Sequence, residues 1–303
     1  MPALGLSGCR RVAVMSDIHG NYHAFRACFE DALSLGAEGF VFLGDYISDL
    51  SMPRETLDLL YEIRRSYPTL CLRGNRERYM LENRRGVHHF APGTRSGSLY
   101  YTYQSLTAAD LAWFEDLPTY VTATVGGLPV EMAHAAAHDD RYYFDPDHAR
   151  FPGVLDDMRT TCFLAGHSHK QFAAVRNGKL VLNPGSVGVP RDHGYLTQYA
   201  LLTVEGGQTM PTLRQIPYDV RAAVRHQMEQ LLPVAGYWAI GVLYDVLTGE
   251  EWMVPMLHRA YAAAGSDTSV MDDEAFWHGV ATEMGMRFTE EELLALLVSE
   301  SRP

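Results

Sequence analysis

Short apolar runs alternate with helical patterns over the first 75 residues of the chain. The apolar runs at 11–15, 39–43 and 69–73 predict three buried strands. Between them, apolar residues recur at three- and four-residue spacing over 22–35 and from Pro53 to Ile63, which predicts two helices. Strands that alternate with helices in this way predict an α/β fold with a parallel sheet.

Between residues 76 and 217 the pattern indicates an insertion followed by further strands. The segment 76–118 is less regular, and we interpret it as a partly helical insertion beside the sheet edge. Two turns, Gly126-Gly127 and Asn177-Gly178, separate strand-like segments and predict hairpins. The elements expected here are helices at 106–117, with Thr107 as N-cap, and at 154–158, and strands at 119–125, 128–132, 162–165, 171–175, 179–182, 199–204 and 212–216.

A change of pattern near Tyr218 divides the chain into two parts. Residues 1–217 hold all the predicted strands, whereas 218–303 is helical. Its apolar residues recur at helical spacing over 220–232, 239–247 and 290–297. We therefore expect a helical C-terminal extension, which could cover a sheet edge, shape a pocket or form a dimer.

Residues of metal-binding types follow directly after the predicted strands. In chain order they are Asp17, His19, Asp45, Asn75, His134, His167 and His169. Each alone has an ordinary structural explanation, as a helix cap or a hydrogen-bonded histidine. Because the carboxyl ends of parallel strands meet at one edge of a sheet, however, we expect these side chains to lie together. Seven nitrogen and oxygen donors exceed the needs of one tetrahedral ion and suit borderline divalent metals, so the sequence predicts two metal ions.

Composition limits the classes of protein to consider. The 303 residues, 47% of them hydrophobic, suffice for one large core or for one domain with a smaller one. A formal net charge of −12 argues against a protein that holds long nucleic acid, but it permits a small phosphorylated substrate in a locally cationic pocket. No apolar run approaches the roughly 20 residues that span a bilayer, and we expect a cytoplasmic protein without membrane contact. The four scattered cysteines favour buried, reduced thiols.

The ordered set Asp17-x-His19, Gly44-Asp45, Gly74-Asn75, His134 and Gly166-His167-x-His169 resembles the calcineurin-like metallophosphoesterase family. The resemblance covers about residues 11–216, and the stretch 183–191 is similar to the signature of the family's compact, mostly prokaryotic phosphodiesterase branch. It implies the metallo-dependent phosphatase fold, a four-layer αββα sandwich of two mixed β-sheets, formed by residues 1–217.

The resemblance also implies a dinuclear metal centre. One metal would be held by Asp17, His19, Asp45 and His169, and the other by Asp45, Asn75, His134 and His167, so that Asp45 bridges the two. Asp45, Asn75 and His134 would be the catalytic residues. A hydroxide that bridges the ions would attack a small phosphodiester or phosphomonoester, without a serine or cysteine nucleophile. Such donors accept manganese, iron, zinc or nickel.

The position after the asparagine, often histidine in this family, is Arg76 here. A guanidinium stays protonated, so Arg76 could bind a phosphate oxygen but could not act as a general acid at neutral pH. The substrate would then need either a good leaving group or another proton donor. Candidate donors, each of which is also explained as an ordinary surface histidine, are His88, His89, His138 and His193.

Further contacts to an anion are expected from backbone amides of the glycine-rich turn 183–188 and from Arg191. The alternative is a tight turn beside a surface arginine. Arg84 and Arg85 are better explained as an exposed loop pair. The aromatic stretches 100–103 and 142–144 could stack on a nucleotide base or pack within the insertion.

Other functions are compatible with parts of this pattern. A dinucleoside polyphosphate hydrolase or a protein phosphatase would use the same centre on a different substrate. A non-catalytic interaction scaffold, as in a retromer subunit with this fold, would have eroded metal ligands, whereas every metal position is filled here. We expect a small phosphorylated substrate, such as a nucleotide, as the partner, and the C-terminal helices could form a homo-oligomer.

Overall fold

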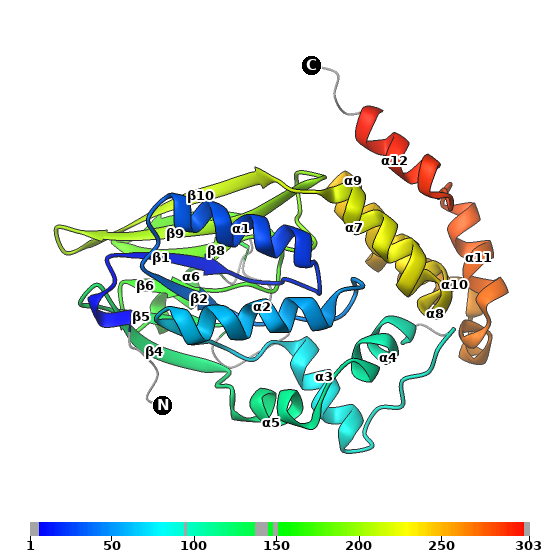
Figure 1. Cartoon of the computed structure of the whole chain (residues 1–303), viewed down its shortest axis with the longest axis horizontal. Helices are drawn as coiled ribbons and strands as arrows, with labels where there is room; N and C mark the ends of the chain where they lie inside the picture. Colours follow the sequence, from blue (N-terminus) through cyan, green and yellow to red (C-terminus); the bar gives the residue numbers. More distant parts are fainter. Residues whose placement is uncertain (1–5, 94–95, 137–144, 148–150, 300–303) are drawn as a thin grey trace.

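The computed structural model describes residues 6–93, 96–136, 145–147 and 151–299. It contains two mixed five-stranded sheets packed face to face (Figure 1). In order across the first sheet the strands are β10 (Gln208–Pro217), β9 (Leu196–Glu205), β1 (Arg11–Met15), β2 (Gly39–Phe42) and β3 (Thr69–Cys71), and across the second they are β4 (Tyr120–Val125), β5 (Leu128–Ala133), β6 (Cys162–Leu164), β8 (Lys179–Pro184) and β7 (Gln171–Arg176). β1, β2 and β3 are parallel, as are β5, β6 and β8, and the remaining strands pair antiparallel.

The central strand β1 is buried on both faces. Val12 points into the apolar layer between the two sheets, whereas Ala13 points into the layer beneath α1 (Tyr22–Ser34) and α2 (Pro53–Ser66). Burial on both faces explains why this strand is an unbroken apolar run. A third apolar layer lies beneath α6 (Phe151–Asp157), on the outer face of the second sheet. The predicted four-layer αββα sandwich is therefore confirmed.

Three helices connect β3 to β4, and they are α3 (Asn75–Arg84), α4 (Gly97–Gln104) and α5 (Ala108–Asp116). Arg84, which was expected in a loop, is the last residue of α3. The ion pair between Arg78 and Glu82, four residues apart, supports the helix up to this point. Arg84 and Arg85 both bind the carboxylate of Glu115 in α5, and both remain exposed.

The aromatic stretch 100–103 lies in α4. Tyr101 packs against an apolar cluster that contains Leu231 and Ala235, and its hydroxyl donates to the backbone oxygen of Ser51 over 3.0 Å. Packing thus accounts for this side chain. Thr107 caps α5, as predicted. The stretch 142–144 and His138 lie outside the described residues.

The residues after β10 form a helical region at one end of the sandwich (Figure 1). Its elements are α7 (Val220–His226), a π-helical turn (Gln227–Leu231), α8 (Leu232–Ala235), α9 (Tyr237–Thr248), α10 (Met253–Ala264), a 3-10 turn (Thr268–Asp272), α11 (Glu274–Glu283) and α12 (Glu290–Ser299). These helices share an apolar core that also contains Leu50 and Val189. Leu50 lies in the loop after β2, in the first sheet, and Val189 lies in the loop after β8, in the second. The extension therefore packs against loops that follow strands of both sheets.

Asp245 in α9 provides a pH-dependent test of this region. One carboxyl oxygen accepts the backbone N–H groups of Trp252 and Met253, while the other is buried and has no hydrogen-bond partner among the residues that the structure describes. Burial raises the pKa of Asp245 to about 6, although the charge of Arg191 opposes this. Ionisation therefore costs stability as the pH rises from about 4 to above 6. Across this range we expect the free energy of unfolding of the wild type to fall by up to about 3 kcal/mol relative to that of Asp245→Asn.

The free energies of unfolding of both proteins in urea at pH 4, 6 and 8 test this expectation. Asparagine keeps the oxygen that accepts the two N–H groups, so the capping of α10 is held constant. A difference between the proteins that does not change with pH would contradict the proposed cost of ionisation.

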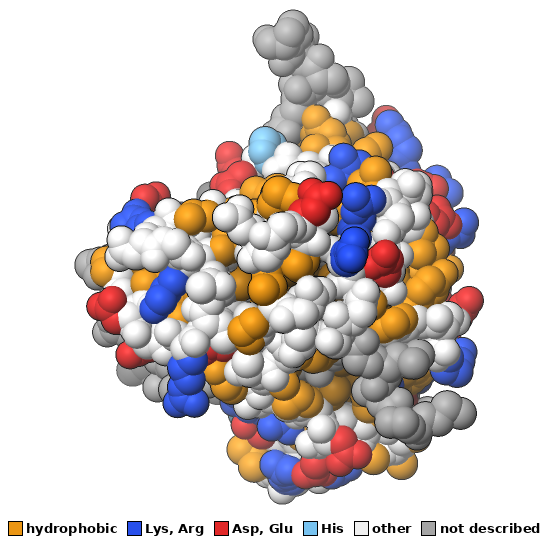
Figure 2. Space-filling model, turned by 90° about the vertical axis from the view of Figure 1, so that its left-hand side faces the viewer, with side chains coloured by type: hydrophobic (Ala, Val, Ile, Leu, Met, Phe, Trp, Pro, Cys, Tyr) orange, Lys and Arg blue, Asp and Glu red, His pale blue; other side chains and the backbone are white. Residues whose placement is uncertain are grey.

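On the face drawn in Figure 2, the described basic side chains are interspersed with acidic ones. Within the described ranges, no helix combines the length and the apolar character needed to cross a membrane.

All four cysteines are free, and three are buried as expected, whereas Cys71 is half-buried because β3 is an edge strand.

Candidate metal centre

Backbone hydrogen bonds bring the polar loops of both sheets together. Because β1 and β2 are parallel neighbours, the N–H of Asp17 donates to Gly44 O and the N–H of His19 donates to Asp45 O, each over 3.0 Å. The second sheet joins them where the N–H of His167 donates to the Asp17 carboxylate over 2.9 Å. The carboxyl ends of both sets of parallel strands thus meet at one edge, as expected for the predicted ligands.

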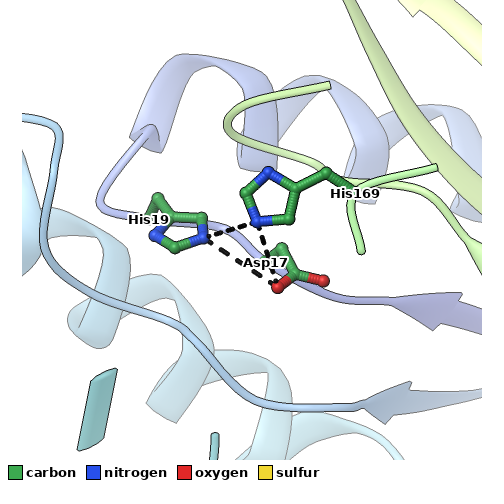
Figure 3. Close-up of side chains that lie close together, drawn as sticks. All are labelled: Asp17, His19 and His169. Carbon is green, nitrogen blue, oxygen red and sulfur yellow. Dashed lines mark hydrogen bonds and ion pairs between the residues drawn. The ribbon is translucent and has the colours of Figure 1, made fainter. Parts of the chain in front are cut away.

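Asp17, His19 and His169 form the first group of donor atoms (Figure 3). The Nε2 atoms of His19 and His169 lie 3.1 Å apart. The Oδ1 atom of Asp17 lies 3.4 Å from Nε2 of His169 and 3.9 Å from Nε2 of His19. That oxygen is buried and has no hydrogen-bond partner in the described part of the chain. The three side chains therefore converge on one point.

Asp45, His134 and His167 form the second group. Nε2 of His134 lies 3.4 Å from Oδ2 of Asp45 and 3.0 Å from Oδ1 of Asn75. The same oxygen of Asp45 lies 3.9 Å from Nε2 of His19, which belongs to the first group. Asp45 thus stands between the two groups. The structure brings all seven predicted ligands together, and their assignment as ligands stays a prediction.

The orientation of the histidine rings fits a metal centre. Nδ1 of His134 donates to Leu43 O over 3.0 Å, and Nδ1 of His169 donates to Val189 O over 2.7 Å. Nδ1 of His19 lies 3.1 Å from a carboxylate oxygen of Asp49. In each ring, Nε2 is therefore the atom that faces the centre.

The contact between two Nε2 atoms tests whether these residues fit a metal. Nδ1 of His169 carries a proton because it donates to Val189 O, so Nε2 of His169 presents a lone pair to Nε2 of His19 over 3.1 Å, an arrangement that a proton or a cation between the two atoms would satisfy. Metal–nitrogen bonds of about 2.0–2.1 Å place neighbouring ligands roughly 3 Å apart. The nitrogen and oxygen donors, without thiolate, also suit borderline divalent ions. The residues present therefore fit divalent metal ions.

Five of the seven predicted ligands have left-handed backbone conformations. The φ angles are 55° for Asp17, 52° for His19, 55° for Asp45, 66° for His167 and 58° for His169. None of these residues is glycine, and each such conformation costs about 1–2 kcal/mol. Strained residues of this kind persist where the surrounding structure over-determines them, and they cluster at functional sites.

The buried ionisable groups of the centre shift one another's pKa values. Burial raises a carboxyl pKa, but His169 beside Asp17 and His134 beside Asp45 outweigh it and hold the pKa of both carboxyls well below the usual range. Burial opposes protonation of His134, yet the charge of Asp45 raises the pKa of this ring to about 9. Burial and the charge of His134 lower the pKa of His167 to about 4. At pH 7, binding of a metal to His134 therefore displaces a proton.

Glu77, which the sequence reasoning missed, holds the loop that carries Asp45. Its fully buried carboxylate accepts the backbone N–H groups of Asp45, Gly74 and Tyr46 over 2.9, 2.9 and 2.8 Å. Glu77 is the third residue of α3, and its bond to the N–H of Gly74, the N-cap, is the glutamate half of a capping box, since glycine has no side chain for the other half. A glutamate three residues after a helix cap is a signal that could have found it.

Replacing Glu77 with glutamine is expected to lower the free energy of unfolding by about 1–3 kcal/mol. Glutamine has one acceptor atom instead of two, so at least one of the three N–H groups would face an NH₂ group. Burial and the charge of Asp45 raise the pKa of Glu77 to about 7, so urea unfolding at pH 8 compares glutamine with the ionised carboxylate. Glu82→Gln, on the surface of the same helix, is the control and should stay within about 0.5 kcal/mol of the wild type.

The predicted phosphate-binding arginines lie in different surroundings. The guanidinium of Arg76 lies 2.8 Å from Asp49 and 3.9 Å from Asp45, beside the second group of donors. The guanidinium of Arg191 lies 2.8 Å from Glu251 and 3.8 Å from Asp245, in the helical extension. The phosphate-binding role of both stays a prediction.

The glycine-rich turn does not offer its amides as expected. The backbone N–H groups of Gly185, Val187, Gly188 and Val189 are all donated to acceptors within the protein. Instead, the hydroxyl of Ser186 donates to Asp17 O over 2.7 Å, so the turn supports the loop of the first ligand. The turn packs against the loop after β1, and the carbonyl oxygens of Ser16 and Asp17 accept the N–H groups of Val187 and Gly188.

A cavity of about 850 Å³ lies beside the loop that carries His167 and His169, but none of the predicted ligands is among its lining residues. It lies between loop 166–169 and the junction of α9 and α10, and its lining includes Ser168, Lys170, Arg191, His193 and Glu251. Of the candidate proton donors, His193 is exposed in this lining, and His88 and His89 are exposed elsewhere.

The fold agrees with that of solved proteins. A metallophosphoesterase from Sphaerobacter thermophilus is 21% identical, with a TM-score of 0.58, and the match covers 73% of this chain and 93% of that one. The hypothetical protein PH1004 from Pyrococcus horikoshii is 19% identical, with a TM-score of 0.67, over 80% of this chain and 99% of that one.

Sequence comparison identifies the family. The uncharacterized protein MJ0912 of Methanocaldococcus jannaschii is 24% identical over 246 residues, which cover 73% of this chain and 93% of that protein. The model of the calcineurin-like phosphoesterase superfamily domain matches residues 11–207, which contain every predicted metal ligand. The chain therefore belongs to the calcineurin-like phosphoesterase superfamily.

Proposed function

We propose that the protein is a metal-dependent phosphoesterase that hydrolyses a small phosphodiester or phosphomonoester at a two-metal centre. The observation that carries this proposal is the pair of donor groups on either side of Asp45, whose Oδ2 lies 3.4 Å from His134 and 3.9 Å from His19. Two divalent ions held there would supply an activated water and positive charge on the phosphoryl oxygens.

The residues of the chain provide the rest of the reaction. Asp45 offers one carboxylate to both groups, so its negative charge reduces repulsion between two cations. The histidine rings are fixed by their Nδ1 contacts and need no reorganisation when a substrate binds. Arg76 is 17% exposed at the edge of the centre and would hold a phosphate oxygen.

The leaving group has two routes. Arg76 does not release a proton at neutral pH, so a substrate with a good leaving group needs no acid from this position. The alternative donor is His193 in the cavity beside loop 166–169, which has room for the alcohol half of an ester. A dinucleoside polyphosphate or a phosphoprotein would be larger substrates for the same centre.

Metal analysis together with hydrolysis assays tests this proposal. Elemental analysis of the purified protein should find about two divalent ions per chain. Bis(p-nitrophenyl) phosphate and p-nitrophenyl phosphate, each assayed with Mn²⁺ and with chelator, should be hydrolysed only with metal. A folded protein that stays inactive after reconstitution with Mn²⁺, Fe²⁺, Zn²⁺ and Ni²⁺ would contradict the proposal and favour an interaction scaffold.

Replacing Arg76 with alanine is expected to raise KM for bis(p-nitrophenyl) phosphate by about 10- to 100-fold, because a charged hydrogen bond to the phosphate is lost. The metal content should stay at the wild-type level, since removal of a positive charge near Asp45 does not weaken cation binding. Steady-state kinetics and elemental analysis of the same preparation measure both.

Arg78→Ala serves as the matched control. Arg78 lies on the same helix, and its guanidinium binds Glu82 over 3.0 Å at the surface. Its kinetics should equal those of the wild type. Loss of the metals from Arg76→Ala would show that Arg76 supports the metal ligands rather than the substrate.

A further inference from the structure

Asp49 lies between one predicted metal ligand and the predicted phosphate-binding residue. Its Oδ2 atom is 3.1 Å from Nδ1 of His19 and 2.8 Å from Nη2 of Arg76, and its side chain is 3% exposed. Nδ1 of His19 has no hydrogen-bond partner among the described residues, so its contact with Asp49 is an ion-pair contact, and it leaves Nε2 to face the first donor group.

The loop that carries Asp49 has a strained backbone. Ser48 and Asp49 have φ angles of 77° and 69°, a left-handed conformation that residues other than glycine rarely adopt twice in succession. The N–H of Leu50 donates to His19 O over 3.0 Å, which ties the loop to the first ligand loop. The N–H of Met52 donates to Gly20 O over 3.1 Å, and the hydroxyl of Tyr101 in α4 donates to Ser51 O over 3.0 Å.

The helical extension also contacts this loop. The side-chain amide of Gln227 donates to the backbone oxygen of Asp49 over 3.0 Å, and Gln227 is completely buried. Nδ1 of the preceding residue, His226, lies 2.8 Å from Oγ of Ser51. Gln227 also begins the π-helical turn, a rare conformation that occurs often at functional sites.

We propose that Asp49 and Gln227 are positioning residues of the metal centre: Gln227 holds the loop so that Asp49 can fix His19 for one metal and Arg76 for the substrate phosphate. The role in substrate binding rests on the proposed function, whereas the role in metal binding requires only that the centre takes up metal. By this account the helical extension is part of the centre.

Calorimetric titration of the full chain with Mn²⁺ tests the proposal. Asp49→Asn keeps the size of the side chain and tolerates the left-handed backbone. We expect it to weaken one of the Mn²⁺ sites by about 10- to 100-fold. Gln227→Met keeps the length of the side chain without the N–H donor and should weaken the same site by about fivefold. Binding at the group around His134 should be unchanged.

Gln230→Met is the matched control, because Gln230 is exposed on the same π-helical turn. Circular dichroism establishes that each variant is folded before titration, so loss of stability alone would leave the affinity of the folded protein unchanged. Should Gln227→Met fail to fold, Gln227→Leu takes its place.

Wild-type Mn²⁺ affinity in both folded variants would overturn the proposal, as would an equal loss in Gln230→Met. The KM for bis(p-nitrophenyl) phosphate should also rise in Asp49→Asn, because Arg76 loses its anchor. If the wild type binds Mn²⁺ but hydrolyses no ester, the proposed function fails while the comparison of affinities still decides the role of Asp49 and Gln227.

Discussion

Asp45→Asn is expected to lose one of two bound metals and to lower kcat/KM by about a thousandfold or more. The NH₂ group of asparagine cannot bind a cation, and it would replace the oxygen that lies 3.4 Å from His134 and 3.9 Å from His19. The fold should survive, because asparagine tolerates the left-handed conformation of this residue better than most side chains. Elemental analysis and hydrolysis of bis(p-nitrophenyl) phosphate measure the two losses.

Asp58→Asn is the control for the change of charge. Asp58 lies on the exposed side of α2, where its carboxylate pairs with Arg54 over 2.8 Å. It should keep the wild-type metal content and rate. A fully active Asp45→Asn protein with both metals would refute the assignment of Asp45 as the bridge.

Gly74→Ala should damage both the fold and the centre. A Cβ atom at this residue would lie 2.2 Å from Oδ1 of Asp45 and 2.5 Å from its backbone nitrogen. The backbone of Gly74 has φ −92° and ψ −176°, which alanine adopts freely, so the expected effect comes from the lack of space alone. We expect a loss of about 2–4 kcal/mol in the free energy of unfolding. Displacement of the Asp45 carboxylate should also lower activity by about a hundredfold.

Urea unfolding, metal analysis and kinetics of the same preparation measure these effects. Gly279→Ala is the control, because Gly279 lies within α11 and no atom approaches the position of its Cβ within 4 Å. That variant should be as stable as the wild type or more stable by up to about 1 kcal/mol. If Gly74→Ala were as stable and as active as Gly279→Ala, the loop that carries Asp45 would have moved aside for the added methyl group without a loss of stability or activity.

The ligand loops could be predicted because each one follows a buried strand. The apolar run of β1 and the polar residues Asp17 and His19 after it are local features, and parallel strands bring such loop ends together. The pairing of β1 with β9 is different, because Arg11 lies opposite Thr203 and no local pattern encodes that contact. Periodicity indicated an α/β protein only, and the family resemblance supplied the two sheets.

The supporting residues could not be predicted in the same way. Glu77 acts through hydrogen bonds to backbone N–H groups, Asp49 acts through ion-pair contacts with His19 and Arg76, and neither belongs to the ordered set of ligands. The surroundings of Arg191 depend on Asp245 and Glu251, which come from helices far along the chain. Sequence spacing predicts which residues follow strands, whereas these contacts depend on how loops and helices pack in three dimensions.

The position of β1 in the middle of its sheet has a consequence for synthesis on the ribosome. One edge of β1 pairs with β2, whereas the other waits for β9, whose paired residues are 200–203. At about 5–20 residues per second, that edge stays open for roughly 10–40 s after β1 has been made. An open apolar edge is a template for pairing with another chain. The nascent chain is therefore expected to be more prone to aggregation than the finished protein, and chaperones that bind early in translation should raise the yield.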